Sequence, residues 1–386
     1  MARPIKGLFK KELVPLYLLA GIGMLGHSVF RPILPIFTRH LGASALQIGL
    51  LTSGFMIARA FTSAAGGYII DRGISSRLLI RIGVGIAAIL ILGFYFSNYY
   101  ITVLMVRIAQ GVCSGLIWPS AQIMVGEYSD PNIRARALSL YQIVGRVGMI
   151  ASRGLLAIIL LIGFNLGFSE MGGFRLTFLV GSFILGLGFV QTLTITERPE
   201  VHIDQKKAIH FHPIFILTFI IGGLMAMQSI TILYFNEMFQ LKPVMIVTIL
   251  LIIDIALLIT TYFISYLADR VGIQPALFII IVPCVAAASA LPLMKNIIPF
   301  VLLWFIIRIT ISAFIPVARS YATKLPTGIG SNIGFLNMAT NLGSAIGPIV
   351  AGFLYDRLTG GLKISGYSIL ALFLIPYLIV KIVKKV

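Results

Sequence analysis

Charged residues are scarce in this sequence. Asp, Glu, Lys and Arg make up 11% of the 386 residues, whereas a soluble globular protein has about 25%. Hydrophobic residues account for 59% of the chain, and the mean hydropathy is +1.02. Twelve membrane spans of roughly 22 residues would occupy about 264 residues and leave no loop long enough for a catalytic domain. We therefore expect a membrane protein that is not an enzyme.

Cysteines and acidic residues are also few. Cys113 and Cys284 both lie inside apolar runs, so the sequence has neither a disulfide framework nor a cluster of metal ligands. Asp and Glu total 12 against 30 Lys and Arg, a formal net charge of +18. The basic residues are spread among apolar runs, which argues against binding of nucleic acid. The sequence has no Walker A motif or zinc-ligand spacing, so we expect no cofactor and no ATP-driven transport.

Apolar runs bounded by Gly, Pro, Asn or charge predict an all-α membrane protein with twelve transmembrane helices. The runs lie near 14–36, 46–70, 78–96, 100–126, 137–163, 174–194, 213–236, 244–268, 275–294, 298–322, 331–355 and 364–383. The basic N-terminus before the first run imitates a signal peptide, but the eleven later runs favour a first span. The longest polar stretch, 196–212, predicts a cytoplasmic linker between six-helix bundles at 1–195 and 213–386.

Most Lys and Arg outside the runs fall on the side of the membrane that holds the N-terminus. Basic loops stay cytoplasmic. We therefore expect both termini in the cytoplasm, and the short loops suit a multi-pass protein of a prokaryotic inner membrane.

The two halves of the chain carry matching residues. Gly67-Tyr68-Ile69-Ile70-Asp71-Arg72 follows the second span, and Ser265-Tyr266-Leu267-Ala268-Asp269-Arg270 follows the eighth. Arg107 lies in the fourth span and Arg308 in the tenth. An internal repeat of this kind is typical of secondary transporters, in which two bundles rock about a central site.

These residues resemble the major facilitator superfamily. The two Asp-Arg loops, Arg107-Ile108-Ala109-Gln110-Gly111 and the layout of six plus six spans carry the resemblance over almost the whole chain. The first span also carries a pattern similar to the first-span motif of the drug and proton antiporter branch. The pattern is Leu25-Gly26, five residues, and then Pro32-Ile33-Leu34-Pro35. The resemblance implies alternation between inward-open and outward-open states.

The resemblance also implies an inner gate in the cytoplasmic loops. The acid after the second span would stabilise the outward-open form through a basic side chain and the start of span eleven. The gating candidates are Asp71, Arg72, Glu127, Arg134, Arg136, Asp269 and Arg270. The alternative is that the arginines only fix the topology, and the two roles are compatible.

Ionisable residues inside the spans are the main candidates for a substrate site. A charge in the hydrocarbon core costs at least about 2.5 to 3.5 kcal/mol, so it needs a partner, a water-filled cavity or a role in transport. The spans of the N-terminal half contain five arginines and no Asp or Glu in their interiors, which indicates an anionic substrate. The substrate-binding candidates are Arg153, Arg107, Arg59, Arg31, Gln228, Asn337 and Asn341.

Each of these candidates has a structural alternative. Arg31 and Arg146 are close enough to span ends to reach lipid headgroups, and Arg107 can pack against helix carbonyls. The polar residues of spans seven and eleven can form hydrogen bonds between helices. Gly115, Gly148 and Gly343 permit close helix packing.

Asp254 is the one acid deep in a span. It can pair with Arg308, which would be structural, or release a proton during transport. His27 is the one histidine in a span, and Asp254, Arg308 and His27 are the coupling candidates. Proton coupling is the usual driving force in the resembled family, and uniport stays open. Pro32 and Pro35 are expected to break the first span near its outer end.

The sequence therefore predicts a secondary active transporter for a small organic anion, surrounded by membrane lipids and working as a monomer. The alternative is a multidrug exporter of lipophilic compounds, favoured by the first-span motif. The lack of an acid in the N-terminal spans opposes cationic drugs. A non-transporting receptor or assembly factor on the same fold is a third possibility, against which the gate residues in both halves argue.

Overall fold

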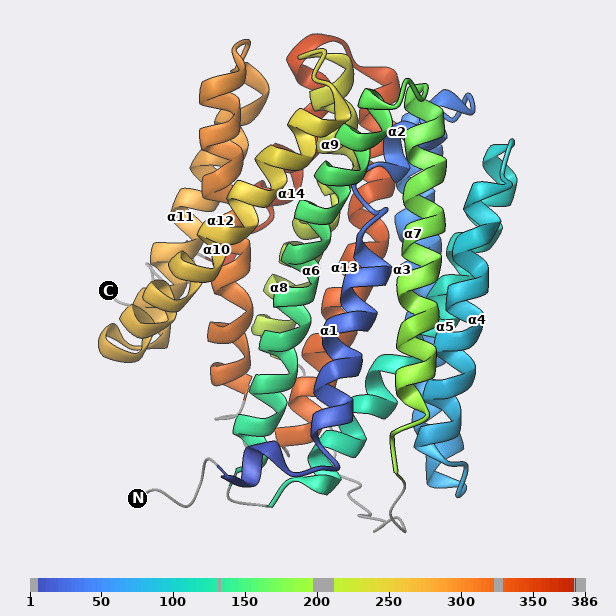
Figure 1. The fold of residues 1–386 in the computed structure, drawn as a ribbon. Helices are drawn as coiled ribbons and strands as arrows, with labels where there is room; N and C mark the ends of the chain where they lie inside the picture. Colours follow the sequence, from blue (N-terminus) through green and yellow to red (C-terminus); the bar gives the residue numbers. More distant parts are fainter. Residues whose placement is uncertain (1–5, 131–132, 197–211, 323–328, 378, 380–386) are drawn as a thin grey trace. The chain divides into compact units, whose positions relative to one another are not determined.

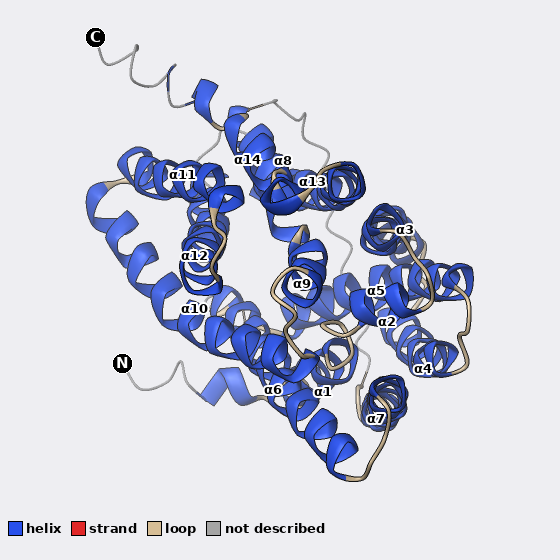
Figure 2. Ribbon diagram, turned by 90° about the horizontal axis from the view of Figure 1, so that it is seen from above, coloured by secondary structure: helices blue, strands red, loops and turns tan. Residues whose placement is uncertain are grey.

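The computed structural model describes residues 6–130, 133–196, 212–322, 329–377 and 379. Within these ranges the chain consists of helices, turns and short loops, with no strand (Figure 1, Figure 2). The predicted all-α class is confirmed. Residues 197–211 of the predicted linker 196–212 lie outside the described residues. In the predicted twelfth span, 364–383, residues 378 and 380–383 also lie outside them.

Helices occupy all twelve predicted spans. In the first half these are α1 (Val14–Ser28), α2 (Leu34–His40), α3 (Ala45–Asp71), α4 (Ser76–Tyr95), α5 (Tyr100–Tyr128), α6 (Arg134–Asn165) and α7 (Glu170–Thr192). In the second half they are α8 (Pro213–Ala226), α9 (Gln228–Glu237), α10 (Pro243–Val271), α11 (Ile273–Ala290), α12 (Ile297–Ala322), α13 (Ile329–Arg357) and α14 (Gly366–Leu372). Ten segments of the described chain are long and apolar enough to cross a membrane, with α8 and α9 counted together. Shorter apolar helices occupy the first and twelfth spans.

Two of the predicted spans are divided. The first is interrupted between α1 and α2: Pro32 stands in the connection and Pro35 is the second residue of α2, as expected from the missing N–H and the bulk of each ring. The seventh is divided at Met227, between α8 and α9. No proline marks this second break, and the sequence analysis did not predict it. The break places Gln228 at the first turn of α9.

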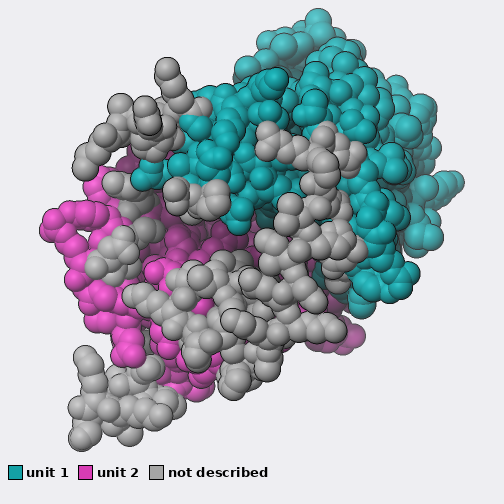
Figure 3. Space-filling model, turned by 90° about the horizontal axis from the view of Figure 1, so that it is seen from below, with its two compact units in different colours: residues 1–42, 57–203, 243–251 teal, residues 43–56, 204–242, 252–386 magenta. Residues whose placement is uncertain are grey.

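The chain forms two compact units by its internal contacts (Figure 3). Unit 1 comprises residues 1–42, 57–203 and 243–251, and unit 2 comprises 43–56, 204–242 and 252–386. Two helices are therefore shared: α3 changes unit at Ile57 and α10 at Ile252. The bundle boundaries inferred from the sequence stay a prediction.

Unit 1 is built on close packing of α1 against α6 and α7, and of α4 against α5 and α7. A Cβ atom added at Gly148 of α6 would lie 2.2 Å from the carbonyl oxygen of Gly21 of α1. The backbones of these helices can approach so closely because neither residue has a side chain. Phe30, Phe94 and Phe178 form a fully buried aromatic cluster between α1, α4 and α7.

Unit 2 is built on close packing of α8 against α13, and of α11 against α12 and α14. A Cβ atom at Gly343 of α13 would lie 1.8 Å from the carbonyl oxygen of Phe219 of α8. Buried aromatic rings fill the space beside α12, where Tyr234 stacks on Phe300 with ring centroids 5.0 Å apart. Small residues thus set the helix spacing in both units.

Candidate functional site

Unit 1 gathers five basic side chains in the interior of its bundle. They come from α1, the α1–α2 connection, α3, α5 and α6, and they are His27, Arg31, Arg59, Arg107 and Arg153. Arg31 lies within electrostatic range of the other three arginines. The side chains of His27, Arg107 and Arg153 are only 5 to 6% exposed. We refer to these five residues as the basic cluster.

The acidic residues of unit 1 lie at helix ends and in loops within the described ranges. Glu12 precedes α1, Glu127 is in the last turn of α5, and Glu170 is the first residue of α7. Asp130 follows α5 and pairs with Lys10 at 2.6 Å near the surface. Asp71 is the last residue of α3. The acidic residues described in unit 1 therefore lie away from the middle of the helices that carry the basic cluster.

Arg107 is held by a neighbour on its own helix. Its Nη1 atom donates a hydrogen bond of 3.0 Å to Oε1 of Gln110, three residues further along α5. Gln110 is fully buried. This bond fixes the direction of the guanidinium group at one turn of α5, where the other members of the basic cluster are in electrostatic range.

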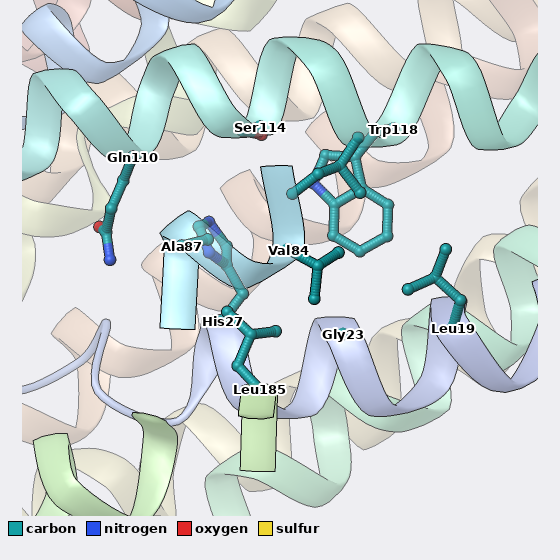
Figure 4. Close-up of a pocket in the computed structure, with 10 residues that line it drawn as sticks. Leu19, Gly23, His27, Val84, Ala87, Gln110, Ser114, Trp118 and Leu185 are labelled. Atoms are coloured by element: carbon teal, nitrogen blue, oxygen red, sulfur yellow. The ribbon is translucent and has the colours of Figure 1, made fainter. Parts of the chain in front are cut away.

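A small cavity lies beside this pair, between α1, α4, α5 and α7 (Figure 4). Figure 4 shows His27 of α1 together with Gln110, Ser114 and Trp118 of α5 around the space, and apolar side chains complete the lining. Nε2 of Gln110 and Oγ of Ser114 are buried and make no hydrogen bond to the described residues. The cavity has room for roughly one water molecule. An organic solute does not fit in it.

The two arginines of α6 differ in their surroundings. Arg153 is 6% exposed, whereas Arg146, seven residues earlier, is exposed. Tyr141 of the same helix is buried and lies in electrostatic range of Arg59. Arg153 is therefore buried and Arg59 half-buried, and Arg146 provides a matched arginine at an exposed position of α6.

Unit 2 contains a buried ion pair. Nη2 of Arg308 on α12 lies 3.0 Å from Oδ1 of Asp254 on α10, and the two side chains are 14% and 4% exposed. Nη1 of Arg308 donates a second hydrogen bond, of 2.5 Å, to Oε1 of Gln228 at the start of α9. Pairing with Arg308 was one of the two alternatives that the sequence left open for Asp254, whereas the link to Gln228 was not predicted.

Aromatic residues extend this network. The guanidinium carbon of Arg308 lies 5.7 Å from the ring centroid of Trp304. Nε1 of Trp304 donates to the hydroxyl of Tyr367 at 3.2 Å, and that hydroxyl is 2.9 Å from Oγ1 of Thr231. Trp304 and Tyr367 were not among the predicted site residues. A Trp and a Tyr in apolar helices could have indicated a buried polar network, because the N–H of Trp and the O–H of Tyr usually find a hydrogen-bond partner when they are buried.

The polar residues of α13 have separate partners. Asn337 is exposed and accepts a hydrogen bond of 3.4 Å from Arg319 of α12, and Asn341 is half-buried. Oγ of Ser344 donates to the carbonyl oxygen of Gly222 on α8 at 3.0 Å. These contacts agree with hydrogen bonding between helices, and a role of Asn337 or Asn341 in substrate binding stays a prediction.

The predicted gate residues lie at helix ends. Arg72 and Arg270 are exposed, and each stacks on the tyrosine four residues earlier, Tyr68 at 4.3 Å and Tyr266 at 4.7 Å. Three more candidates are exposed: Glu127 in the last turn of α5, and Arg134 and Arg136 in the first turn of α6. The side chains of Asp71 and Asp269 lie outside the described part of the structure. Gating by these residues stays a prediction.

Comparison with known proteins gives a family match across the chain. The family model described as Major Facilitator Superfamily matches residues 16–348 and, in a second match, 214–383. The chain is 20% identical over 374 residues to Quinolone resistance protein NorA of Staphylococcus aureus (strain COL), with 90% of each protein covered. It is 24% identical over 383 residues to Multidrug resistance protein 2 of Bacillus subtilis (strain 168), with 91% of each covered. These names agree with the first-span resemblance to drug antiporters.

Solved transporter structures have the same fold. A bacterial homologue of the human lysosomal transporter Spinster, inward-facing and unoccupied, has a TM-score of 0.74 at 15% identity, covering 96% of this chain and 93% of that one. The nucleoside transporter NupG has a TM-score of 0.70 at 17% identity, covering 96% and 97%. At these identities the likeness concerns the fold alone.

Proposed function

The chain belongs to the Major Facilitator Superfamily and is a multi-pass transporter of the cell membrane, and on that premise we propose that it exports amphiphilic organic compounds that carry a negative charge. The basic cluster of unit 1 supports this substrate class. Several cations gathered in one apolar bundle attract an entering anion, because Coulomb interactions are strong where water is excluded. The names of the relatives support export, because both are resistance proteins.

Arg107 and Arg153 are the residues we assign to the anionic group of the substrate. A guanidinium presents paired N–H donors that match the two oxygens of a carboxylate. Arg107 is already oriented by Gln110, so less side-chain entropy is lost when it binds. Arg59 and Arg31 add to the attraction without direct contact, because Coulomb interactions act over a longer range in an apolar bundle than in water.

We assign proton coupling to the ion pair of unit 2. Protonation of Asp254 would neutralise the carboxylate and leave Arg308 with Gln228 as its bonded neighbour. The network therefore has two arrangements that differ by one proton, which is what a coupling element requires. Both termini in the cytoplasm and action as a monomer are part of this proposal.

A second candidate is export of lipophilic cations or neutral compounds. The resistance-protein names of the relatives and the first-span motif favour it. It makes no use of the basic cluster, and this difference allows the two candidates to be separated.

Thermal unfolding of the purified protein in detergent tests the proposal. The probes are a fluoroquinolone with a free carboxylate, the methyl ester of the same compound, and tetraphenylphosphonium as a lipophilic cation. A ligand at 100 times its Kd stabilises the folded state by about 2.7 kcal/mol. We expect the free acid to raise Tm, and the ester and the cation to have little effect.

Two arginine variants of α6 sharpen this experiment. In Arg153→Ala the stabilisation by the free acid should be lost, and in Arg146→Ala it should remain, because Arg146 lies outside the buried cluster. If the cation stabilises the protein instead and Arg153→Ala makes no difference, the substrate is not anionic. Flux of the stabilising compound in proteoliposomes then measures transport directly.

A further inference from the structure

The Asp-Arg motif of the two inner loops occurs a third time, at the end of α13. The third copy is Gly352-Phe353-Leu354-Tyr355-Asp356-Arg357. It reproduces the stacking seen in the other two, because the guanidinium carbon of Arg357 lies 5.3 Å from the ring centroid of Phe353 four residues earlier. The three copies therefore share a local structure, an arginine stacked on an aromatic ring four residues earlier, as well as a sequence pattern.

The third copy lies at the opposite end of α3 from the first copy. Asp71 ends α3, whereas Asp356 contacts its beginning. The helix has 27 residues, so about 40 Å separate the two positions. In the orientation inferred from the basic loops, the end that holds Asp356 is extracellular.

Asp356 caps the N-terminus of α3. Its two carboxylate oxygens accept hydrogen bonds from the backbone N–H of Ala45 at 2.9 Å and of Leu46 at 2.8 Å. The next donor, the N–H of Gln47, is bonded to Oγ of Ser44, and the N–H of Ser44 to the side chain of Gln47. This reciprocal arrangement is a capping box. The first two donors of α3 thus depend on a carboxylate from another helix, which also has a favourable interaction with the helix dipole.

Glycines bring the two helices together at this contact. A Cβ atom at Gly49 of α3 would lie 2.2 Å from the carbonyl oxygen of Pro348. A Cβ atom at Gly352 of α13 would lie 2.4 Å from the carbonyl oxygen of Ala45. The beginning of α3 and the end of α13 are therefore in backbone contact over two turns, without side chains between them.

This contact joins a helix that belongs to both units. The first part of α3 packs in unit 2 and the part from Ile57 onward packs in unit 1, where Gly115 of α5 contacts the backbone of Arg59. Both sides of the contact with Asp356 lie in unit 2, so the contact holds the beginning of α3 in a different unit from the rest of the helix. The carboxylate of Asp356 is exposed to solvent, so water can replace its two bonds when the helices separate.

We propose that Asp356 is a gating residue, which with Gly49 and Gly352 latches the beginning of α3 to the end of α13 and thereby keeps the extracellular end closed. Opening of this latch converts the protein to the outward-open state. The latch acts at the opposite end from the inner gate that the other two copies of the motif predict.

Labelling of an engineered cysteine tests the latch without any substrate. Ala45→Cys places a thiol at a fully buried position of the contact, and the native Cys113 and Cys284 are themselves buried. We expect a membrane-impermeant maleimide to label this cysteine in whole cells slowly in the parent and about tenfold faster when Asp356→Ala is added. Glu170→Ala removes an exposed acid at the same expected side and should leave the rate unchanged.

A second reporter separates gating from loss of packing. Asn337→Cys lies on the other half of α13, at an exposed position expected to face the cytoplasm. If Asp356 is a gating residue, labelling of this cysteine in inside-out vesicles should fall while labelling at Ala45→Cys rises. Asp356→Asn keeps the volume of the side chain, and its labelling rates at both cysteines should lie between those of the parent and Asp356→Ala. This variant can be measured if Asp356→Ala is unstable.

Two results would overturn the proposal. Equal labelling of Ala45→Cys with and without Asp356 would show that the contact does not hold the end closed. A rise in labelling at both reporters would show that Asp356 supports packing alone. Because no solute is used, either result is independent of the proposed anionic substrate.

Discussion

Removal of one partner of the buried ion pair should destabilise the protein strongly. Asp254→Asn keeps the shape of the side chain but leaves the positive charge of Arg308 without its carboxylate. Truncation of one partner of a buried pair typically costs 3–5 kcal/mol. Arg308 keeps its hydrogen bond to Gln228 and is 14% exposed, so we expect a value near the lower end, about 3 kcal/mol.

A double variant isolates the contribution of the pair. Asp254→Leu combined with Arg308→Met replaces both charges with apolar groups, an exchange that is often nearly neutral. Gln228 loses one hydrogen bond, which costs about 1 kcal/mol. The double variant should therefore be more stable than Asp254→Asn although it carries one more substitution.

The measurement is Tm in detergent by intrinsic fluorescence. A change of 1 kcal/mol moves Tm by roughly 2 to 4 °C in domains of this order of size, so Asp254→Asn should lower Tm by about 6 to 12 °C. Asp130→Asn is the control, because its pair with Lys10 is exposed, at 58% and 32% of the two side chains. Exposed pairs contribute about 0 to 1 kcal/mol. An equal effect of Asp130→Asn and Asp254→Asn, or a double variant less stable than the single one, would show that the buried pair does not stabilise the protein as expected.

Three further changes test other parts of the structure. Gln110→Glu places a carboxylate beside Arg107, so the affinity for the anionic probe should fall at least about tenfold, measured by titration, while Tm does not fall. Tyr367→Phe removes the acceptor of the Trp304 N–H in a buried site, and should cost about 1 to 3 kcal/mol in thermal unfolding. Gly343→Ala forces α8 and α13 apart, so the yield of monodisperse protein should drop, with a loss of roughly 1 to 3 kcal/mol or more.

Each of these predictions has a clear contrary result. Unchanged anion affinity in Gln110→Glu would remove Arg107 from the proposed site. A neutral Tyr367→Phe would mean that water replaces the lost hydroxyl. For the glycine, Gly154→Ala is the control, because a Cβ there meets no atom within 4 Å, and equal yields of the two alanine variants would contradict the packing argument.

The positions of the helices were predictable because the bilayer requires long apolar segments with satisfied backbones. The break of the first span was also predictable, since Pro32 has a fixed geometry. The break at Met227 was not, because it has no proline and its neighbours are ordinary helix formers. The contact of Gln228 with Arg308 was not predicted either.

The candidate site was predictable in composition but not in arrangement. The sequence indicated that arginines without nearby acids lie in the first half, and the structure groups Arg107, Arg153 and His27 in the buried part of unit 1. Position along the fifth span already separated Arg146, which is near a span end, from Arg153, and in the structure Arg146 is exposed whereas Arg153 is 6% exposed. The cap by Asp356 joins residues more than 300 positions apart, and no local pattern reports such a contact.

The shared helices have a genetic consequence. Residues 43–56 from the first half of the chain complete unit 2, and residues 243–251 from the second half complete unit 1. A gene cut between the two halves would therefore encode two fragments that each lack a helical segment supplied by the other. We expect such fragments to depend on each other for folding.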